Sequence, residues 1–298
     1  MNILIGQNHL DTLGGTETYI YTLIAELTKR GHYISLISGT DKFGLTSEKI
    51  YSDFNIIPNK LKKEYDVGFI NHTSTIKRLL DSNIKCKTLY QICHGATPEL
   101  EQPYGHPIEK YIVISEEVRD HLKSKSFESV VVRNGIDTER FKPEEYSSDL
   151  RKVLSLSHSQ RFNLFLKKIC DRNNWGFAYH NKYTNPVFDI ENIIKQADLV
   201  VTLGRGAYES MACGKNVLVA DWRPYQMPLM DGMITEDTID NFIYNNCSGR
   251  CEKKTITEDS ITEEIKKYSV ENSKHNRAYA LKNLNIQKQV DIMLSLVE

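Results

Sequence analysis

The stretch Val200–Asp221, VVTLGRGAYESMACGKNVLVAD, decides the fold. An apolar run ends in the glycine-rich turn 204–206, a short helix-like segment follows, and a second apolar run begins after Gly214. Apolar runs that alternate with helical segments are typical of parallel strands joined by crossover helices. A glycine-rich turn after such a strand lets the backbone approach an anion, and the start of the next helix favours negative charge.

The turn carries side chains that suit a ligand with negative charge at one end and hydroxyls at the other. Arg205 lies between Gly204 and Gly206, and its planar guanidinium fits phosphate oxygens. Glu209 is expected in the first turn of the helix, where it can accept hydrogen bonds from paired sugar hydroxyls. In the alternative without a ligand, the glycines serve packing, Glu209 compensates the helix dipole, and Arg205 is a solvated turn residue.

The same alternation runs through most of the chain. The predicted strands span residues 2–6, 33–38, 65–70, 87–93, 110–115, 129–133, 152–157, 175–180, 198–203 and 216–221. Between the first two strands, four apolar residues at helical spacing share one face: Ile20, Leu23, Ile24 and Leu27. Gly31 is expected to end that helix. The segment 231–260 has no clear period and receives no assignment.

Polarity rises and a proline appears over residues 138–150, which predicts a domain boundary there. We expect an N-terminal domain over 1–143 and a short second domain over 144–273, with a last helix over 274–298. The fold class is therefore α/β, with two Rossmann-like parallel-sheet domains that face each other across a cleft. Such proteins bind ligands at the carboxyl ends of their strands.

Composition limits the classes of function. With 298 residues, 40% of them hydrophobic and 26% charged, the chain has the makeup of a soluble globular protein, and its net charge of −1 gives no basic excess for nucleic acid. We see no secretory leader, no apolar run near the roughly 18–20 residues that span a bilayer, and no disulfide-like cysteine spacing, so we expect a cytoplasmic protein. The pair in CSGRC (247–251) lacks a second pair at zinc spacing, and no metal site is predicted.

Two more stretches could carry a site. In HLDTLGGTETY (9–19), Gly14 and Gly15 follow the first strand, where their loop can face a phosphate or a sugar. The alternative is a tight turn with Glu17 placed for the helix dipole. In YQICHGATPE (90–99), His94 ends an apolar strand and is expected to point into the cleft. A lone histidine is nevertheless more often structural than catalytic.

These stretches, in this order, resemble the retaining glycosyltransferases of the GT-B fold, and in particular glycosyltransferase family 4. The opening loop and helix (14–38), the segments YIVISEEVRDHL (111–122) and VVVRNGIDTERFKP (130–143), and the segment ADLVVTLGRGAYESMACGKNVLVA (197–220) each look like the corresponding family motif. The likeness is strongest over residues 1–40, 108–143 and 197–221.

The resemblance implies a nucleoside-diphosphate-sugar donor on the second domain and an acceptor on the first. Glu209 then matches the glutamate that holds the ribose hydroxyls, the Gly14–Gly15 loop lies beside the donor phosphates and the acceptor, and His94 lies near the donor sugar. The resemblance also implies transfer with retention, no metal, no cofactor beyond the donor as co-substrate, and a last helix that crosses back onto the first domain.

The chain departs from the family at two places. The family has a second glutamate eight positions before Glu209, where this chain has Val201. The family also places an arginine and a lysine after the first strand of the second domain, whereas SLSHSQRFN offers His158 and Arg161. Arg161 is then expected to take the part of the lysine, and Arg205 to compensate for the missing partner.

Three functions remain open. The first is a glycosyltransferase that acts on a carbohydrate, lipid-linked or small-molecule acceptor, with His94, Arg161 and Arg205 as its catalytic residues. The second is a catalytically silent protein that keeps the fold and binds a nucleotide sugar or a partner, which the missing glutamate favours. The third, a GT-B epimerase, is favoured least, because the RNGID segment (133–137) fits transferases better. Peripheral contact with a membrane also stays open, but no feature of the sequence supports it.

Overall fold

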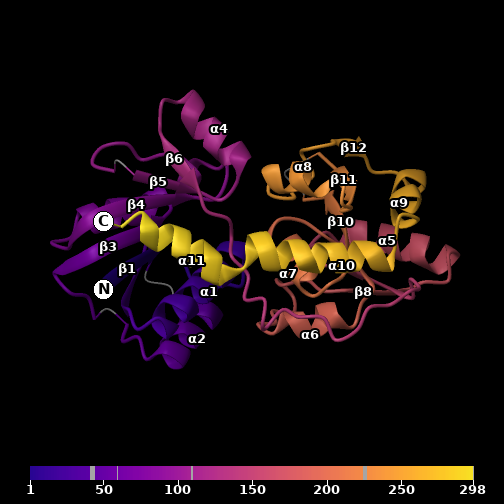
Figure 1. The fold of residues 1–298 in the computed structure, drawn as a ribbon, viewed down its shortest axis with the longest axis horizontal. Coiled ribbons are helices and arrows are strands. Elements are labelled where there is room, and N and C mark those ends of the chain that lie inside the picture. Colours follow the sequence, from indigo (N-terminus) through magenta and orange to yellow (C-terminus); the bar gives the residue numbers. More distant parts are fainter. Residues whose placement is uncertain (41–43, 59, 109, 224–226, 298) are drawn as a thin grey trace. The chain divides into compact units, whose positions relative to one another are not determined.

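The computed structural model describes residues 1–40, 44–58, 60–108, 110–223 and 227–297. The chain divides into two compact units: Met1–Gly135 with Ile286–Glu298, and Ile136–Asn285 (Figure 1). Each unit is built on one six-stranded sheet covered by helices, so the predicted α/β class with two Rossmann-like units is confirmed. The cleft that the sequence predicts between them stays a prediction.

The N-terminal unit has an all-parallel sheet with strand order β2-β1-β3-β4-β5-β6. Its strands are β1 (Asn2–Gln7), β2 (Tyr33–Ser38), β3 (Glu64–Asn71), β4 (Lys85–Cys93), β5 (Lys110–Val113) and β6 (Ser129–Val131). Its helices are α1 (Gly15–Lys29), α2 (Leu45–Phe54), α3 (Thr73–Leu80), η1 (Glu99–Glu101), α4 (Glu116–Ser124) and α11 (Ile286–Ser295). Buried side chains of α1, α2 and α11 form one core cluster with the sheet, and those of α3 and α4 form another.

The C-terminal unit has the strand order β12-β11-β10-β9-β7-β8, with β7 to β10 parallel and β11 and β12 antiparallel. Its strands are β7 (Lys152–Ser155), β8 (Gly176–Tyr179), β9 (Leu199–Thr202), β10 (Asn216–Asp221), β11 (Leu229–Met233) and β12 (Lys254–Thr255). Its helices are α5 (Gln160–Arg172), α6 (Ile190–Lys195), α7 (Arg205–Ala212), α8 (Ile239–Tyr244), α9 (Glu258–Ile265), α10 (Val270–Tyr279) and the π-helix η2 (Ala280–Leu284). Within the described part of the chain, no helix combines the length and the apolar character needed to span a membrane.

Helix α1 forms where the apolar spacing predicts it and ends at the predicted glycine. The four apolar residues at helical spacing are all buried. Gly31 follows the last helical turn with φ = +80°, a backbone conformation that glycine adopts without a steric cost. The amphipathic pattern of the sequence therefore places α1 against the sheet and leaves the loop 8–14 at the carboxyl end of β1.

Two predicted boundaries differ from those of the structure. The first unit ends at Gly135 rather than at 143, because Ile136 and Phe141 are buried in the core of the second unit. The last helix is not one segment over 274–298 but two: α10 belongs to the C-terminal unit and only α11 to the N-terminal unit. The break comes at Asn285, whose extended backbone (φ = −62°, ψ = 128°) ends η2. Residue 298 lies outside the described residues.

Helix α5 offers a matched test of the core of the C-terminal unit. Leu166 is fully buried, whereas Leu164 on the same helix is 56% exposed. We predict that Leu166→Ala lowers the free energy of unfolding by about 2–5 kcal/mol, because it removes buried methyl groups and leaves a cavity. Leu164→Ala should change it by less than about 0.5 kcal/mol. Urea unfolding followed by tryptophan fluorescence measures both, since Trp175 and Trp222 lie in this unit. Equal effects of the two substitutions would contradict the packing described.

Candidate functional site

Both sheets contain a point at which the strand order reverses. In the N-terminal unit, β1 lies between β2 and β3; in the C-terminal unit, β7 lies between β8 and β9. Successive connections leave such a point in opposite directions, which opens a crevice outside the carboxyl ends of the strands, where α/β proteins bind ligands. The candidate residues from the sequence follow β1 and β4 in the N-terminal unit and β7 and β9 in the C-terminal unit, and each unit is described in turn.

In the C-terminal unit, the turn 204–206 joins β9 directly to α7. Gly204 has φ = +57°, which favours glycine. A Cβ atom on Gly206 would lie 2.4 Å from Oγ1 of Thr202. Both glycines are thus required by the tight strand-to-helix junction itself. They place the N-terminus of α7 at the carboxyl edge of the sheet.

Helix α7 begins at Arg205, so Glu209 lies one turn into the helix and not in its first turn as the sequence predicted. Arg205 and Glu209 are only 6% and 7% exposed. The Nε of Arg205 donates to Oε1 of Glu209 over 2.9 Å. Arg205 is therefore not a solvated turn residue. The i,i+4 spacing brings its guanidinium onto the carboxylate.

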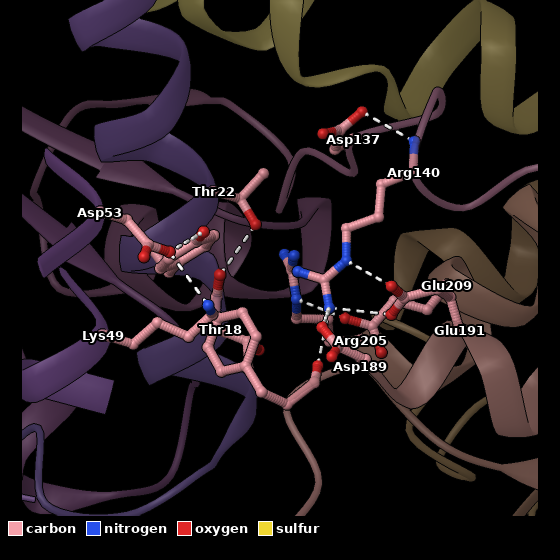
Figure 2. A network of polar contacts seen from close by, with 12 residues as sticks. Thr18, Thr22, Lys49, Asp53, Asp137, Arg140, Asp189, Glu191, Arg205 and Glu209 are labelled. Atoms are coloured by element: carbon pink, nitrogen blue, oxygen red, sulfur yellow. Dashed lines mark hydrogen bonds and ion pairs between the residues drawn. The ribbon is translucent and has the colours of Figure 1, made fainter. Parts of the chain in front are cut away.

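Burial raises the pKa of Glu209, while the charges of Arg205 and Arg140 act in the opposite direction. Arg140 is a second cation that the sequence did not single out. It donates through Nε and Nη2 to the two carboxylate oxygens of Glu191 over 2.9 and 2.8 Å. Figure 2 shows the two ion pairs next to each other, with Asp189 at the edge of the group. Two arginines thus compensate two buried glutamates.

Basic side chains follow three strands of the same sheet: β7 and β8, which are neighbours, and β10, which is separated from β7 by β9. His158 lies between β7 and α5, Lys182 follows β8, and Arg223 follows β10, where its guanidinium donates to the carboxylate of Asp221. Ser159 caps α5 by accepting a hydrogen bond from the N–H of Phe162. Arg161 is exposed in the first turn of α5. This edge therefore combines positive charge with helix N-termini, which together favour an anion.

The pKa of His158, which lies at this edge, is lowered strongly. Burial, followed by the positive charges of Lys182, His180 and Arg223, lowers the pKa of His158 to about 4. The imidazole is therefore neutral at pH 7, and its ring lies edge-on to Tyr183 with a centroid distance of 4.9 Å. Burial is thus the main cause of this shift, and the nearby charges of Lys182 and Arg223 add to it.

In the N-terminal unit, the Gly14–Gly15 loop starts α1. Gly14 is the N-cap residue, and its carbonyl accepts hydrogen bonds from the N–H and the hydroxyl of Thr18. Glu17 is buried, and its Oε1 lies 3.3 Å from Nδ1 of His9. His9 belongs to the loop 8–14 that joins β1 to α1. Glu17 therefore has a histidine partner in addition to the helix dipole.

His94 leaves the end of β4 and belongs to a polar group that the sequence did not predict. Its Nε2 lies 2.6 Å from Oδ1 of Asn71, whose amide N–H donates to the carbonyl of Gly6. Its backbone N–H donates to Oε2 of Glu101 over 2.7 Å. His72, directly after β3, contacts Oε1 of the same carboxylate over 3.0 Å.

Burial alone would raise the pKa of Glu101, but the hydrogen bond from His72 and the charges of His94 and His72 outweigh it, so that pKa is lowered. Glu101 therefore stays ionised although it is only 7% exposed. His72 itself has φ = +67°, which is uncommon for a residue with a side chain. Among the described residues no group of three or more His, Cys, Asp or Glu side chains is arranged so that it could hold a metal ion.

The structure brings the predicted residues together in two sets. Gly204, Arg205, Gly206 and Glu209 form one junction in the C-terminal unit, with Arg161 on the next helix N-terminus along the sheet. Gly14 and Gly15 start α1, and Tyr19 of the same helix packs edge-on against His94 with a ring-centroid distance of 5.3 Å. The sequence analysis missed six residues of these two sets. Arg140 lies inside the quoted segment 130–143 but was not singled out, and the other five stand outside every quoted motif: His72, Glu101, Lys182, Glu191 and Arg223.

Solved structures resemble this chain closely in fold. A provisionally assigned UDP-N-acetylglucosamine 2-epimerase from Listeria monocytogenes matches with a TM-score of 0.60 at 12% identity, over 99% of this chain and 95% of that chain. A mutant of S. aureus TarM, in complex with fondaparinux, α-GlcNAc-glycerol and UDP, matches with a TM-score of 0.59 at 10% identity, over 100% and 99%. These values establish the GT-B type of fold.

A third structure is an α-glucosyltransferase in complex with UDP and a 13-mer DNA, with a TM-score of 0.59 at 12% identity, over 100% of this chain and 99% of that chain. Because that protein is bound to DNA, the expectation that nucleic acid is not a partner finds no support in the comparisons. No family model and no curated protein sequence matches the chain.

The Arg205–Glu209 pair allows a stability prediction. Arg205→Met should lower the free energy of unfolding by about 3–5 kcal/mol, because it leaves a buried carboxylate without its nearest cation. Adding Glu209→Met should restore part of that loss, since the uncompensated charge is then gone. Urea unfolding of the two variants measures this, with Arg172→Met in an exposed ion pair as the control. A double variant less stable than Arg205→Met would contradict the pairing.

His158 allows a second prediction. Its pKa is about 4 in the folded protein and 6.5 when unperturbed. Its imidazole signals in NMR should therefore not titrate between pH 8 and 5. As the pH falls from 6.5 toward 4, the unfolded chain binds a proton that the folded protein does not, so the folded state loses stability in that window. His158→Gln should remove this part of the pH dependence. Titration of His158 near pH 6.5 would contradict the assignment.

Proposed function

We propose that this protein is a glycosyltransferase that takes its sugar from a nucleoside diphosphate. The observation that carries the proposal is the switch point of the C-terminal unit. There the N-termini of α5 and α7, the basic side chains after β7, β8 and β10, and a buried glutamate one turn into α7 surround the carboxyl edge of one sheet. The solved structures with this fold that contain UDP support it.

Each group has a part in the proposed reaction. Arg161 and Lys182, with the helix N-termini, receive the diphosphate and stabilise the negative charge that grows as it departs. Glu209 accepts hydrogen bonds from the ribose hydroxyls. The Nε of Arg205 donates to the Glu209 carboxylate over 2.9 Å. The carboxylate oxygens that would accept the ribose hydroxyls are therefore oriented before the nucleotide arrives. As the resemblance implies, no metal ion takes part.

The acceptor is proposed to bind the N-terminal unit, beside Gly14, Gly15 and His94. Its class is a carbohydrate, a lipid-linked saccharide or a small molecule with a hydroxyl. Retention of configuration is part of the proposal and rests on the resemblance to family 4 alone. The polar side chains at the carboxyl ends of β1, β3 and β4 support a hydroxyl-bearing ligand.

Two specific observations favour other functions. Val201, in the place of the family's first donor glutamate, favours a protein that binds the donor without transfer. The fold of the Listeria protein favours an epimerase that acts on the nucleotide sugar itself. Incubation with UDP-GlcNAc separates the three: a transferase releases UDP slowly, a silent protein releases nothing, and an epimerase produces the C2 epimer.

Binding of UDP tests the donor site directly. By calorimetry, Glu209→Gln should raise the Kd of UDP about 10- to 100-fold, because hydrogen bonds to a charged group contribute about 1.5–3 kcal/mol. Arg161→Ala should raise it several-fold. Arg172→Ala, at the other end of α5, is the matched control and should leave it unchanged. If Glu209→Gln folds as the parent does and binds UDP equally well, the donor site is not here.

A further inference from the structure

We propose that the amino edge of the N-terminal sheet is a docking surface for a lipid bilayer with anionic headgroups. The candidate acceptor residues follow the carboxyl ends of β1 and β4, at the opposite edge of the same sheet, so a bilayer bound here does not cover them. The proposal goes beyond the proposed transferase function and does not depend on it. All of the residues that carry it belong to the N-terminal unit.

The four residues before β3 run across this edge of the sheet. The Nζ of Lys62 lies 3.8 Å from the ring centroid of Tyr33, at the start of β2, and donates to Oδ1 of Asn2, at the start of β1. The carbonyl of Lys63 accepts the backbone N–H of Lys85, at the start of β4, over 2.8 Å. The amino ends of β2, β1 and β4 are therefore joined into one surface by the approach to β3.

Positive charge gathers on this surface. Its exposed lysines come from segments that are distant in the sequence: Lys60, Lys62, Lys63, Lys85, Lys87 and Lys110. Among the described residues, the nearby carboxylates are those of Glu64, Asp66 and Asp81, and Asp66 is paired with Lys87 over 2.8 Å. The whole chain has a net charge of only −1, so the excess of lysine is local. Such an excess attracts a negatively charged surface.

Apolar side chains are exposed among these lysines. Ile57 and Tyr33 are 58% and 44% exposed beside a hollow of about 270 Å³, and Leu80 is 40% exposed beside a second hollow of about 460 Å³. Lysines line both hollows: Lys60 lines the first, and Lys85, Lys87 and Lys110 line the second. Cationic and apolar groups thus share the same two places on the surface.

The second hollow forms because β4 extends past β5. The described pairing of the two strands begins only at Tyr90 and Lys110, so residues 85–89 of β4 have no partner in β5. Leu80 and Ile84 lie beside the space that remains. A hollow with an apolar lining and cations around it suits the boundary of a bilayer, where acyl chains and anionic phosphates lie next to each other.

The composition of the surface favours a bilayer over another macromolecule. Protein interfaces are depleted in lysine and enriched in arginine, whereas all of the cations named above are lysines. A nucleic acid bound through its phosphates would leave Ile57 and Leu80 in water. Lysine neutralises headgroups without a fixed geometry, and exposed apolar side chains enter the interface beside them.

Co-sedimentation of the full chain with vesicles tests the role of charge. Vesicles of phosphatidylcholine are compared with vesicles that also contain phosphatidylglycerol. The parent should bind only the second kind, and added NaCl should weaken the binding. Lys60→Gln, Lys63→Gln and Lys85→Gln together should lower the partition coefficient at least about 10-fold, because each lysine near an anionic surface contributes about fivefold.

Three exposed lysines of the C-terminal unit provide the matched control. Lys142→Gln, Lys168→Gln and Lys274→Gln together change the net charge by the same amount. This variant should bind the vesicles as the parent does, because its substitutions lie outside the proposed surface. All of the substituted side chains are exposed, so both triple variants should keep the far-UV circular dichroism of the parent.

A second pair of variants tests the apolar contribution. Ile57 and Leu164 are exposed to almost the same extent, 58% and 56%, but Leu164 lies on α5 of the C-terminal unit. Ile57→Ser should lower the partition coefficient about 10-fold, because a side chain that enters the interface is lost. Leu164→Ser should leave it unchanged. An effect of Ile57→Ser no larger than that of Leu164→Ser overturns the proposal.

The remaining outcomes separate this proposal from the proposed function. Equal losses in the two lysine variants, equal binding to both kinds of vesicle, or binding of duplex DNA without binding of vesicles overturns the docking surface. The variant at Lys60, Lys63 and Lys85 should bind UDP as the parent does. A parent chain that binds UDP but no vesicles overturns this proposal alone, and one that binds vesicles but no UDP overturns the proposed function alone.

Discussion

Carboxylates taken out of water must be compensated, and this constraint organises the candidate sites in both units. Glu209 and Glu191 are buried in the C-terminal unit and are paired with Arg205 and Arg140. Glu101 is buried in the N-terminal unit and is held by one imidazole and one backbone N–H. A buried charge without a partner would cost several kcal/mol. The groups that can contact a ligand are therefore fixed by the same contacts that keep the fold stable.

The pairing changes the part that Arg205 can play. The sequence assigned it to the diphosphate, as a substitute for a missing cation. In the structure, the Nε of Arg205 instead donates a hydrogen bond to Glu209, four residues later on the same helix. A guanidinium in this position lowers the cost of burying the carboxylate and orients it at once. The cations that lie at the edge of the sheet, Lys182 and Arg161, are then better placed to receive an anion, since neither is buried.

The periodic spacing of apolar residues predicted most of the strands and helices, and it failed where local packing departs from a regular period. Strands such as β9 and β10 are buried on both faces, so they appear as continuous apolar runs. The segment 231–260 gave no period, because β12 has two residues and Asp231 lies inside β11. Asp231 is fully buried there because its carboxylate accepts the backbone N–H groups of Gly249, Cys251 and Glu252. Glu101 was missed for a related reason: its partners come from strands that only the folded sheet brings together.

The two units therefore offer different chemistry at equivalent positions of similar sheets. The carboxyl edge of β7, β8 and β10 carries Lys182 and Arg223 beside His158, whose pKa is lowered by burial and then by these charges, and such an edge suits a group that gains negative charge. The carboxyl edge of β3 and β4 holds two histidines on one ionised glutamate, which gives this edge hydrogen-bonding groups in place of net positive charge. Neither edge needs the side chains of the other to have this character, because each set of partners lies within one unit.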